Sequence, residues 1–139
     1  MFDTPESAES TFYAAFEARN VDAMMAVWAS GDGIACIHPL AAPLNGRAAV
    51  AAGWRSMFEA AGQFRVRIET VHEMREAEQV IRIVREYLVI GQETGPRPPI
   101  LATNVYRKAA GGWRMVLHHA SPLQVDGTPP ARTPPVVLH

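Results

Sequence analysis

The chain has 139 residues and a mass of 15.2 kDa, which predicts one domain with a substantial core. Its formal net charge is -1, so no extended basic surface favours nucleic acid, and no apolar run is long enough to cross a bilayer. The single cysteine, Cys36, excludes an intramolecular disulfide and a zinc site made of cysteines alone. Because the acidic, polar N-terminal stretch is unlike a secretory signal, we expect a cytoplasmic protein.

Helices are predicted in the first half of the chain. Thr4 is the expected N-cap of the first, and Asp22 is the expected N-cap of a second helix over residues 23–29. A third helix is predicted between Gly46 and Gly62. Apolar side chains recur at helical spacing in these segments: Phe12, Phe16, Met24, Val27, Trp28, Val50, Trp54, Met57 and Phe58.

Strands dominate the second half. They are predicted at residues 34–38, 64–72 and 80–90 and, as a hairpin, at 100–122. The hairpin turns at residues 109–112, where two glycines can adopt positive φ. Loops or polar turns are expected at residues 40–45, 73–78 and 91–99. Helices grouped before a mainly antiparallel sheet predict an α+β fold with the helices on one face.

The C-terminal segment differs in composition from the rest. Two Pro-Pro pairs after residue 126 exclude regular helix and central strand. We therefore divide the chain into a domain at residues 1–125 and a Pro-rich tail at residues 126–139. The tail is expected to be a disordered end or, through residues 136–138, to dock on a partner subunit.

The order of these segments resembles the nuclear transport factor 2-like superfamily, particularly its SnoaL-like and ketosteroid isomerase-like branch. The matching pieces span residues 7 to 122 and read STFYAAFEARNVDAMMAVW, IACIHP, NGRAAVAAGW, and TNVYRK followed by GWRMVLHHAS. The resemblance implies a cone-shaped, strongly curved, mainly antiparallel sheet packed on three helices around a deep apolar pocket. It also implies a homodimer formed through the outer face of the sheet, a small apolar ligand and no cofactor.

The resemblance also carries candidate catalytic residues. Steroid isomerases of this fold use a carboxylate base before a proline at the end of the first strand, and His38 stands there before Pro39. Their tyrosine donor lies on the first helix, where this chain has Phe12 with Tyr13 beside it. Their second oxyanion donor is an acid on the penultimate strand, and Asn104 occupies that position. The resemblance thus implies an imidazole base and one amide donor, with the other donor lost.

His118 and His119 are adjacent on the last strand, so their side chains should point to opposite faces of the sheet. The match to the isomerase wall places His119 inward with Met115 and Leu117 and His118 outward, an assignment that one β-bulge would reverse. His119 is therefore the third candidate catalytic residue. The side chains expected to line the pocket are Phe12, Tyr13, Phe16, Trp28, Trp54, Phe58, Tyr106 and Leu117.

Other polar residues have simpler interpretations. Cys36 and His38 share a strand face and could form a metal site with His119, but the spacing matches no zinc signature. We therefore expect a buried structural cysteine and no metal. The charged residues of the central strand are expected at the solvent or dimer face, although one facing inward would bind an acidic ligand group: Arg82, Arg85 and Glu86.

Two functional hypotheses remain open at this stage. The first is a cofactor-independent isomerase, cyclase, dehydratase or hydrolase for an apolar carbonyl compound, in which His38 moves the proton and Asn104, with His119, holds the oxyanion. The second is a non-catalytic dimeric module that binds a ligand or a protein. Fold alone cannot choose between them, because this architecture hosts both.

Overall fold

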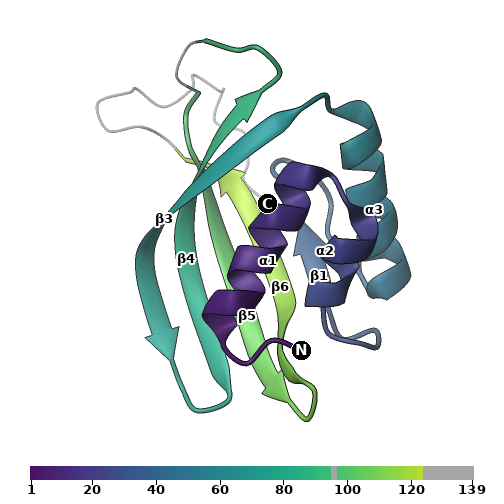
Figure 1. The fold of residues 1–139 in the computed structure, drawn as a ribbon, viewed down its shortest axis with the longest axis vertical. Coiled ribbons are helices and arrows are strands. Elements are labelled where there is room, and N and C mark those ends of the chain that lie inside the picture. The colour runs from purple at the N-terminus through teal and green to yellow at the C-terminus, as the bar shows by residue number, and fades with distance from the viewer. Residues whose placement is uncertain (95–96, 124–139) are drawn as a thin grey trace, which may run out of the picture.

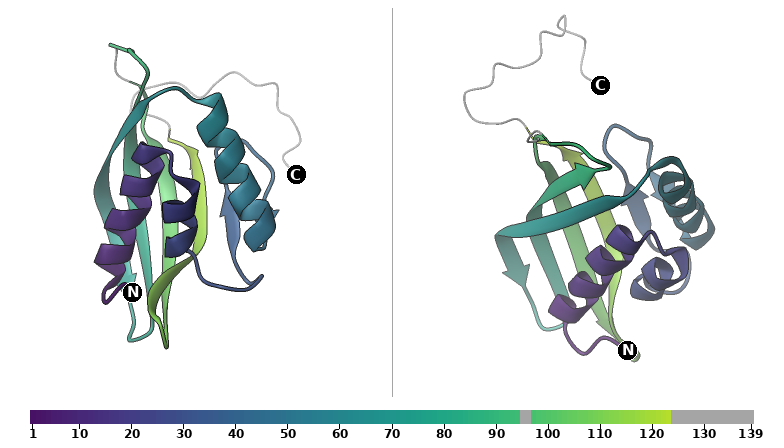
Figure 2. Two further views of the ribbon diagram at one scale, coloured as in Figure 1. Left: turned by 45° about the vertical axis from the view of Figure 1, so that its right-hand side comes forward. Right: turned by 45° about the horizontal axis from the view of Figure 1, so that its top comes forward.

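The computed structural model describes residues 1–94 and 97–123. Its elements are α1 (Pro5–Ala18), α2 (Val21–Val27), β1 (Ala35–Ile37), β2 (Leu44–Asn45), α3 (Arg47–Ala60), β3 (Phe64–Arg75), β4 (Gln79–Ile90), β5 (Ile100–Ala109) and β6 (Gly112–Pro122). The three helices lie on one face of a curved sheet (Figures 1 and 2). The predicted α+β architecture is confirmed, and the predicted tail at residues 126–139 lies outside the described residues.

In the described part of the chain the sheet has six strands, in the order β2-β1-β6-β5-β4-β3. Strand β1 is parallel to β6, and all other neighbours are antiparallel. The four long strands follow one another as a meander, and the last of them, β6, lies beside the first strand of the sequence, β1. This arrangement brings β1 and β6 together behind α1 and α2 (Figure 1).

Local sequence explains the helix starts. Thr4 caps α1 as predicted, because its Oγ1 accepts a 3.0 Å hydrogen bond from the backbone N–H of Ser7. The predicted cap of α2 was wrong: the helix begins at Val21, and Asn20 Oδ1 accepts from the N–H of Ala23 at 2.9 Å. Asparagine is as good an N-cap as aspartate, so the earlier of the two residues starts the helix.

Two predicted loops are partly strand. Strand β3 continues through residues 73–75, where the prediction had a polar turn, and Glu73 pairs with Arg82 across the ladder. Oppositely charged cross-strand neighbours stabilise such a polar end. The predicted loop at residues 40–45 contains β2, in which Leu44 pairs with Cys36. Both errors arose because polar or short segments gain their pairing from tertiary contacts rather than from their own pattern.

The core lies between the helices and the concave face of the sheet. Phe12, Val50 and Trp54 from the helices and Val84 and Met115 from the strands are all fully buried there. Within residues 1–94 and 97–123, no helix is both long enough and apolar enough to span a membrane.

Candidate functional site

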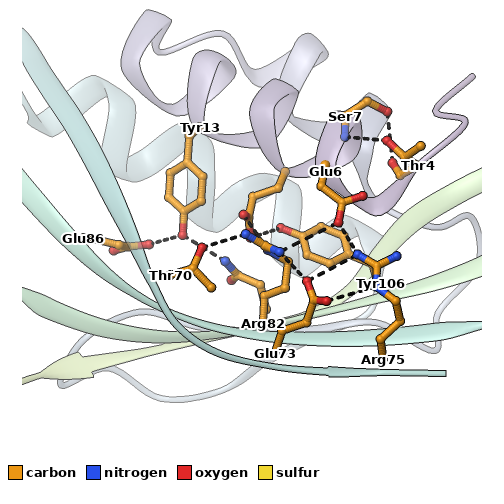
Figure 3. A network of polar contacts seen from close by, with 12 residues as sticks. Thr4, Glu6, Ser7, Tyr13, Thr70, Glu73, Arg75, Arg82, Glu86 and Tyr106 are labelled. Atoms are coloured by element: carbon orange, nitrogen blue, oxygen red, sulfur yellow. Dashed lines mark hydrogen bonds and ion pairs between the residues drawn. The ribbon is translucent and has the colours of Figure 1, made fainter.

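Four polar side chains form a continuous hydrogen-bonded chain inside this core. Tyr13 on α1 donates to Glu86 Oε2 on β4 at 2.6 Å, and Asn104 Nδ2 on β5 donates to the Tyr13 hydroxyl at 2.9 Å. Asn104 Oδ1 lies 2.6 Å from His118 Nδ1 on β6. All four residues are buried, and Figure 3 shows Tyr13 pointing at Glu86. Buried polar groups that satisfy one another in this way specify one arrangement of the core.

The direction of the hydrogen bonds fixes the state of His118. Because the amide of Asn104 donates to Tyr13, its Oδ1 is free to accept from His118 Nδ1–H. Burial, with smaller contributions from the nearby His38 and His119, lowers the pKa of His118 to about 3. The imidazole is therefore neutral near pH 7, with its Nε2 atom 3.9 Å from Glu86 Oε2.

Glu86 is one of the residues that the sequence interpretation placed wrongly. It was expected at the solvent or dimer face, but it is only 2% exposed and points into the core. Alternation along β4 carried the signal, since Val80, Val84 and Glu86 lie at even spacing on one face. Burial raises the pKa of Glu86 to about 7, although the hydrogen bond from Tyr13 opposes that rise.

Tyr13 supplies the hydroxyl that was expected to be lost. Phe12 aligns with the isomerase tyrosine by spacing and is fully buried, but the hydroxyl of Tyr13, the next residue, reaches Asn104. Burial and the neighbouring Glu86 raise the pKa of Tyr13 well above its usual value, so the phenol remains a proton donor. The helix therefore presents one aromatic ring and one hydroxyl to the interior from adjacent positions.

A β-bulge in β6 reverses the predicted orientation of the two histidines. Tyr106 pairs with Met115 but Val105 pairs with Leu117, which leaves Val116 as an extra residue in β6. Beyond the bulge the alternation changes sign, because two residues of β6 oppose one of β5. His118 is consequently 1% exposed and inside, whereas His119 is exposed, so the expectations for both were wrong.

Leu117 was also predicted to line the pocket, and this too was wrong. It pairs with Val105, which pairs with Ile81, and the three residues form a row on the outer face of the sheet. Their inner-face counterparts are Val80 and Tyr106, both fully buried. The bulge therefore moves Leu117 to the side of the sheet away from the helices.

His38 follows β1 and is partly buried, at the edge of the aromatic core. Its ring meets Trp54 edge-to-face at a centroid distance of 4.6 Å, and its Nε2 lies 3.7 Å from Cys36 Sγ. Its Nδ1 is buried and has no hydrogen-bond partner in the described part of the chain, and burial lowers the pKa of His38. The ring of Trp54 also lies 5.9 Å from that of His118, so Trp54 contacts both histidines. No hydrogen bond joins His38 to Asn104 among the described residues.

The predicted lining residues of α1 and α3 form one aromatic cluster. The ring of Trp54 contacts those of Phe12, Phe16 and Phe58 at centroid distances of 5.5, 5.2 and 5.5 Å. Each is at most 6% exposed, so these rings pack on one another, and those of Phe12 and Trp54 also contact the neutral ring of His118. An apolar pocket between them stays a prediction. A cavity of about 520 Å³ lies elsewhere, beside α2 and the β5–β6 turn. Trp28 is the one predicted lining residue that borders this cavity.

A second polar cluster lies toward the start of α1. Glu9 accepts from Tyr106 at 3.0 Å and from Arg82 at 2.8 Å, and Arg82 also contacts Glu73 and Thr70 (Figure 3). Arg82 was expected at the solvent or dimer face, yet its side chain is only 14% exposed and points to the helix side. Its inward guanidinium is already neutralised by Glu9 and Glu73, which ties α1 to β3 and β4.

The alternative metal site does not come together. Cys36 is buried near His38, but His119 faces away from both. Within the part of the chain that the structure describes, no group of three or more His, Cys, Asp or Glu side chains is arranged to hold a metal ion. Burial raises the pKa of Cys36 to about 12, so its thiol stays protonated.

Comparison with known proteins identifies relatives of this fold. A family model described as a SnoaL-like domain matches residues 6–125. The F-box protein SKIP8 of Arabidopsis thaliana is 28% identical over 120 residues, which are 86% of this chain and 50% of that protein. The chain thus spans about half the length of this curated relative.

Two solved structures illustrate the likeness. The first, from Thiobacillus denitrificans, is named "Putative calcium/calmodulin-dependent protein kinase type II association domain"; it is 74% identical with a TM-score of 0.87, covering 89% of this chain and 98% of that one. The second, from Streptomyces avermitilis, is named a "putative dehydratase from the NTF2-like family"; it is 23% identical with a TM-score of 0.75, covering 88% and 100%, and shows the fold alone. The chain therefore belongs to the SnoaL-like domain family and has the cone fold of the nuclear transport factor 2-like superfamily.

Proposed function

We propose that this chain binds a small apolar carbonyl compound between its helices and sheet and moves a proton on it without a cofactor, as an isomerase- or lyase-type enzyme. The observation that carries the proposal is the buried Tyr13–Glu86 pair, in which a carboxyl with a pKa of about 7 contacts a phenol. A buried acid whose pKa is strongly shifted, and which is hydrogen-bonded to a specific partner among apolar side chains, is typical of a functional site.

The donors suit a developing oxyanion. Tyr13 and Asn104 carry hydroxyl and amide protons and are neighbours in the hydrogen-bonded chain of the core, and protonated Glu86 adds a third donor. Preorganised donors in a dry interior stabilise an enolate more than they would in water. In this proposal the ligand's carbonyl oxygen replaces one of the internal hydrogen bonds, so binding requires the aromatic cluster to open.

His38 is the proposed base. Burial lowers its pKa, so the imidazole is neutral and can accept a proton near pH 7. It precedes a turn closed by a hydrogen bond from Ala41 N–H to the His38 carbonyl, and this turn carries Leu40, whose side chain is 92% exposed. We infer that a ligand enters at this turn, because His38 is the member of the site nearest to solvent.

A ligand screen followed by an exchange assay tests the proposal. Steroids, aromatic ketones and lactones would be screened by thermal shift, and each hit incubated in deuterated buffer while NMR follows exchange of the protons next to its carbonyl. We expect His38→Ala to abolish exchange with binding retained, and Tyr13→Phe to weaken both. His72→Ala, an exposed histidine on β3, is the matched control. Binding without exchange in the wild type would leave a ligand-binding module and overturn the catalytic proposal.

A second proposed function is self-association through the outer face of the sheet. The row Ile81, Val105 and Leu117 places three apolar side chains on that face, all only partly buried in a single chain. Apolar side chains that gather on one face and keep part of their surface accessible are found at protein interfaces. The word "association" in the name of the 74% identical protein agrees with such a role.

Light scattering tests the assembly. We expect the wild type to be a homodimer, and Val105→Asp to be a folded monomer because it places a charge in the middle of the row. Val71→Asp, at a position already 44% exposed on β3, controls for the added charge. A wild type that stays monomeric at high concentration would refute the proposed interface.

A further inference from the structure

The cavity of about 520 Å³ is separate from the interior polar chain. It lies between the C-terminal end of α2, the segment that follows, and the turn joining β5 to β6. Its volume falls in the range typical of small-molecule sites. Among the described residues, three arginines line it, Arg47, Arg107 and Arg114, and no aspartate or glutamate does.

Within residues 1–94 and 97–123, the arginines of this cavity form no ion pair with an acidic side chain. Arg107 and Arg114 face each other directly across the β5–β6 ladder, an arrangement of like charges that is destabilising on its own. Arg107 donates to the neutral Gln79 Oε1 at 3.2 Å. Arg114 donates to the carbonyl oxygen of Trp113 at 2.9 Å, and its guanidinium lies 5.2 Å from the centre of the Phe2 ring. In the described part of the chain, neither has an ion pair with a carboxylate.

Arg47 completes the set from the other wall. Its guanidinium donates to the carbonyl oxygens of Met25 at 2.8 Å, Ala29 at 3.0 Å and Trp28 at 3.3 Å, at and just beyond the end of α2. These bonds fix the position of the guanidinium before any ligand arrives, so little side-chain freedom is lost on binding. Like the other two arginines, Arg47 has no carboxylate partner among the described residues.

The rest of the lining is largely apolar. Met25, Trp28, Ile34 and Val116 contribute to the walls, and the glycine turn at residues 111–112 forms part of the rim. We propose that this cavity binds a small organic anion with an apolar body and two negative charges, such as a phosphate monoester or a dicarboxylate. Arginine presents a planar fork of donors that matches the oxygens of either group.

Calorimetric titration of the full chain tests this site, with phenyl phosphate and phthalate as probes and benzyl alcohol as the neutral control, in about 150 mM salt to screen loose attraction. Each lost charge-assisted contact should weaken binding about tenfold or more. We therefore expect the double variant Arg107→Gln, Arg114→Gln to lose at least that much affinity. The double variant Arg65→Gln, Arg67→Gln removes the same charge from exposed positions on β3 and should bind like the wild type.

The outcomes separate the alternatives. Binding of phenyl phosphate alone, or of phthalate alone, supports the site and identifies its anion class. Absence of heat from both anions at millimolar concentration overturns the proposal, as does equal weakening in the two double variants, which would indicate general charge attraction. Glu86→Gln should bind these anions like the wild type, because Glu86 does not line the cavity; a failure of the interior proposal therefore leaves this one intact.

Discussion

The hydroxyl of Tyr13 and the carboxyl of Glu86 meet at 2.6 Å across the interior, although 73 positions separate them in the chain. This contact joins the first helix to the fourth strand at the one point in the described core where an acid carries a pKa of about 7. The acid is poised between its charged and neutral forms near neutral pH. The contact therefore couples the stability of the fold to its proposed chemistry.

Glu86→Gln should change how stability depends on pH. The folded-state pKa of Glu86, about 7, lies above its ordinary 4.5, so the folded state disfavours the carboxylate. The free energy of unfolding is therefore highest below pH 4.5, where Glu86 is neutral in both states. It falls by about 3 kcal/mol in total as the pH rises through 7 and the buried carboxyl must ionise. Urea unfolding of wild type and variant at pH 5 and pH 8 measures this loss, which the variant should lack. Identical pH dependence in both proteins would mean that Glu86 titrates normally.

Tyr13→Phe should destabilise the fold and raise the pKa of Glu86 further. The hydroxyl donates to the carboxylate and accepts from Asn104, so its removal leaves two buried groups unsatisfied, at a cost of about 1–3 kcal/mol. Carbon-13 NMR of the Glu86 carboxyl as a function of pH measures the shift. Tyr87→Phe, on the same strand but bonded only weakly to exposed Glu69, is the control and should change neither quantity. An unaltered Glu86 titration in Tyr13→Phe would contradict the hydrogen bond.

The sequence predicted most of the fold because its signals are local. The stripe around Trp54, the cap at Thr4 and the glycine turn at residues 109–112 each act within a few positions, and the structure has the helix, the N-cap and the hairpin there. The order of helices and strands then left few arrangements in which every apolar face is covered. The short strand β2 was missed because its pairing depends on β1 alone.

The candidate site was less predictable, because it depends on which side of a strand each residue occupies. Asn104 was placed correctly, at an inward position of β5. His118 was not, since the single extra residue Val116 shifts the register and no local pattern marks it. The inward position of Glu86 could have been predicted from its alternation with Val84. It was not, because charged residues are so seldom buried that the residue type was given more weight than the position.

Paired alanine variants of the two histidines test the bulge. His118→Ala removes a buried ring that contacts Phe12 and leaves Asn104 Oδ1 without its donor, so we expect a loss of about 2–4 kcal/mol in unfolding free energy. His119→Ala removes an exposed side chain and should change stability by less than about 0.5 kcal/mol. Chemical denaturation at pH 7 measures both. A larger loss of stability in His119→Ala than in His118→Ala would mean that β6 has no bulge and that His119 points inward.

Two arginines of β4, Arg82 and Arg85, allow the contribution of a buried ion pair to be compared with that of an exposed one. Arg82 is 14% exposed and neutralises Glu9, which is 5% exposed, so Arg82→Gln leaves a buried carboxylate without its cation and should cost about 3 kcal/mol. Arg85 and its partner Glu69 are 39% and 50% exposed, so Arg85→Gln should cost less than about 1 kcal/mol. Urea unfolding in low and in high salt measures both costs. Salt should reduce only the cost of Arg85→Gln, because water and ions reach the Arg85–Glu69 pair. Equal costs for the two variants would show that Glu9 finds sufficient compensation from Tyr106 alone, and that Arg82 does not hold α1 against the sheet.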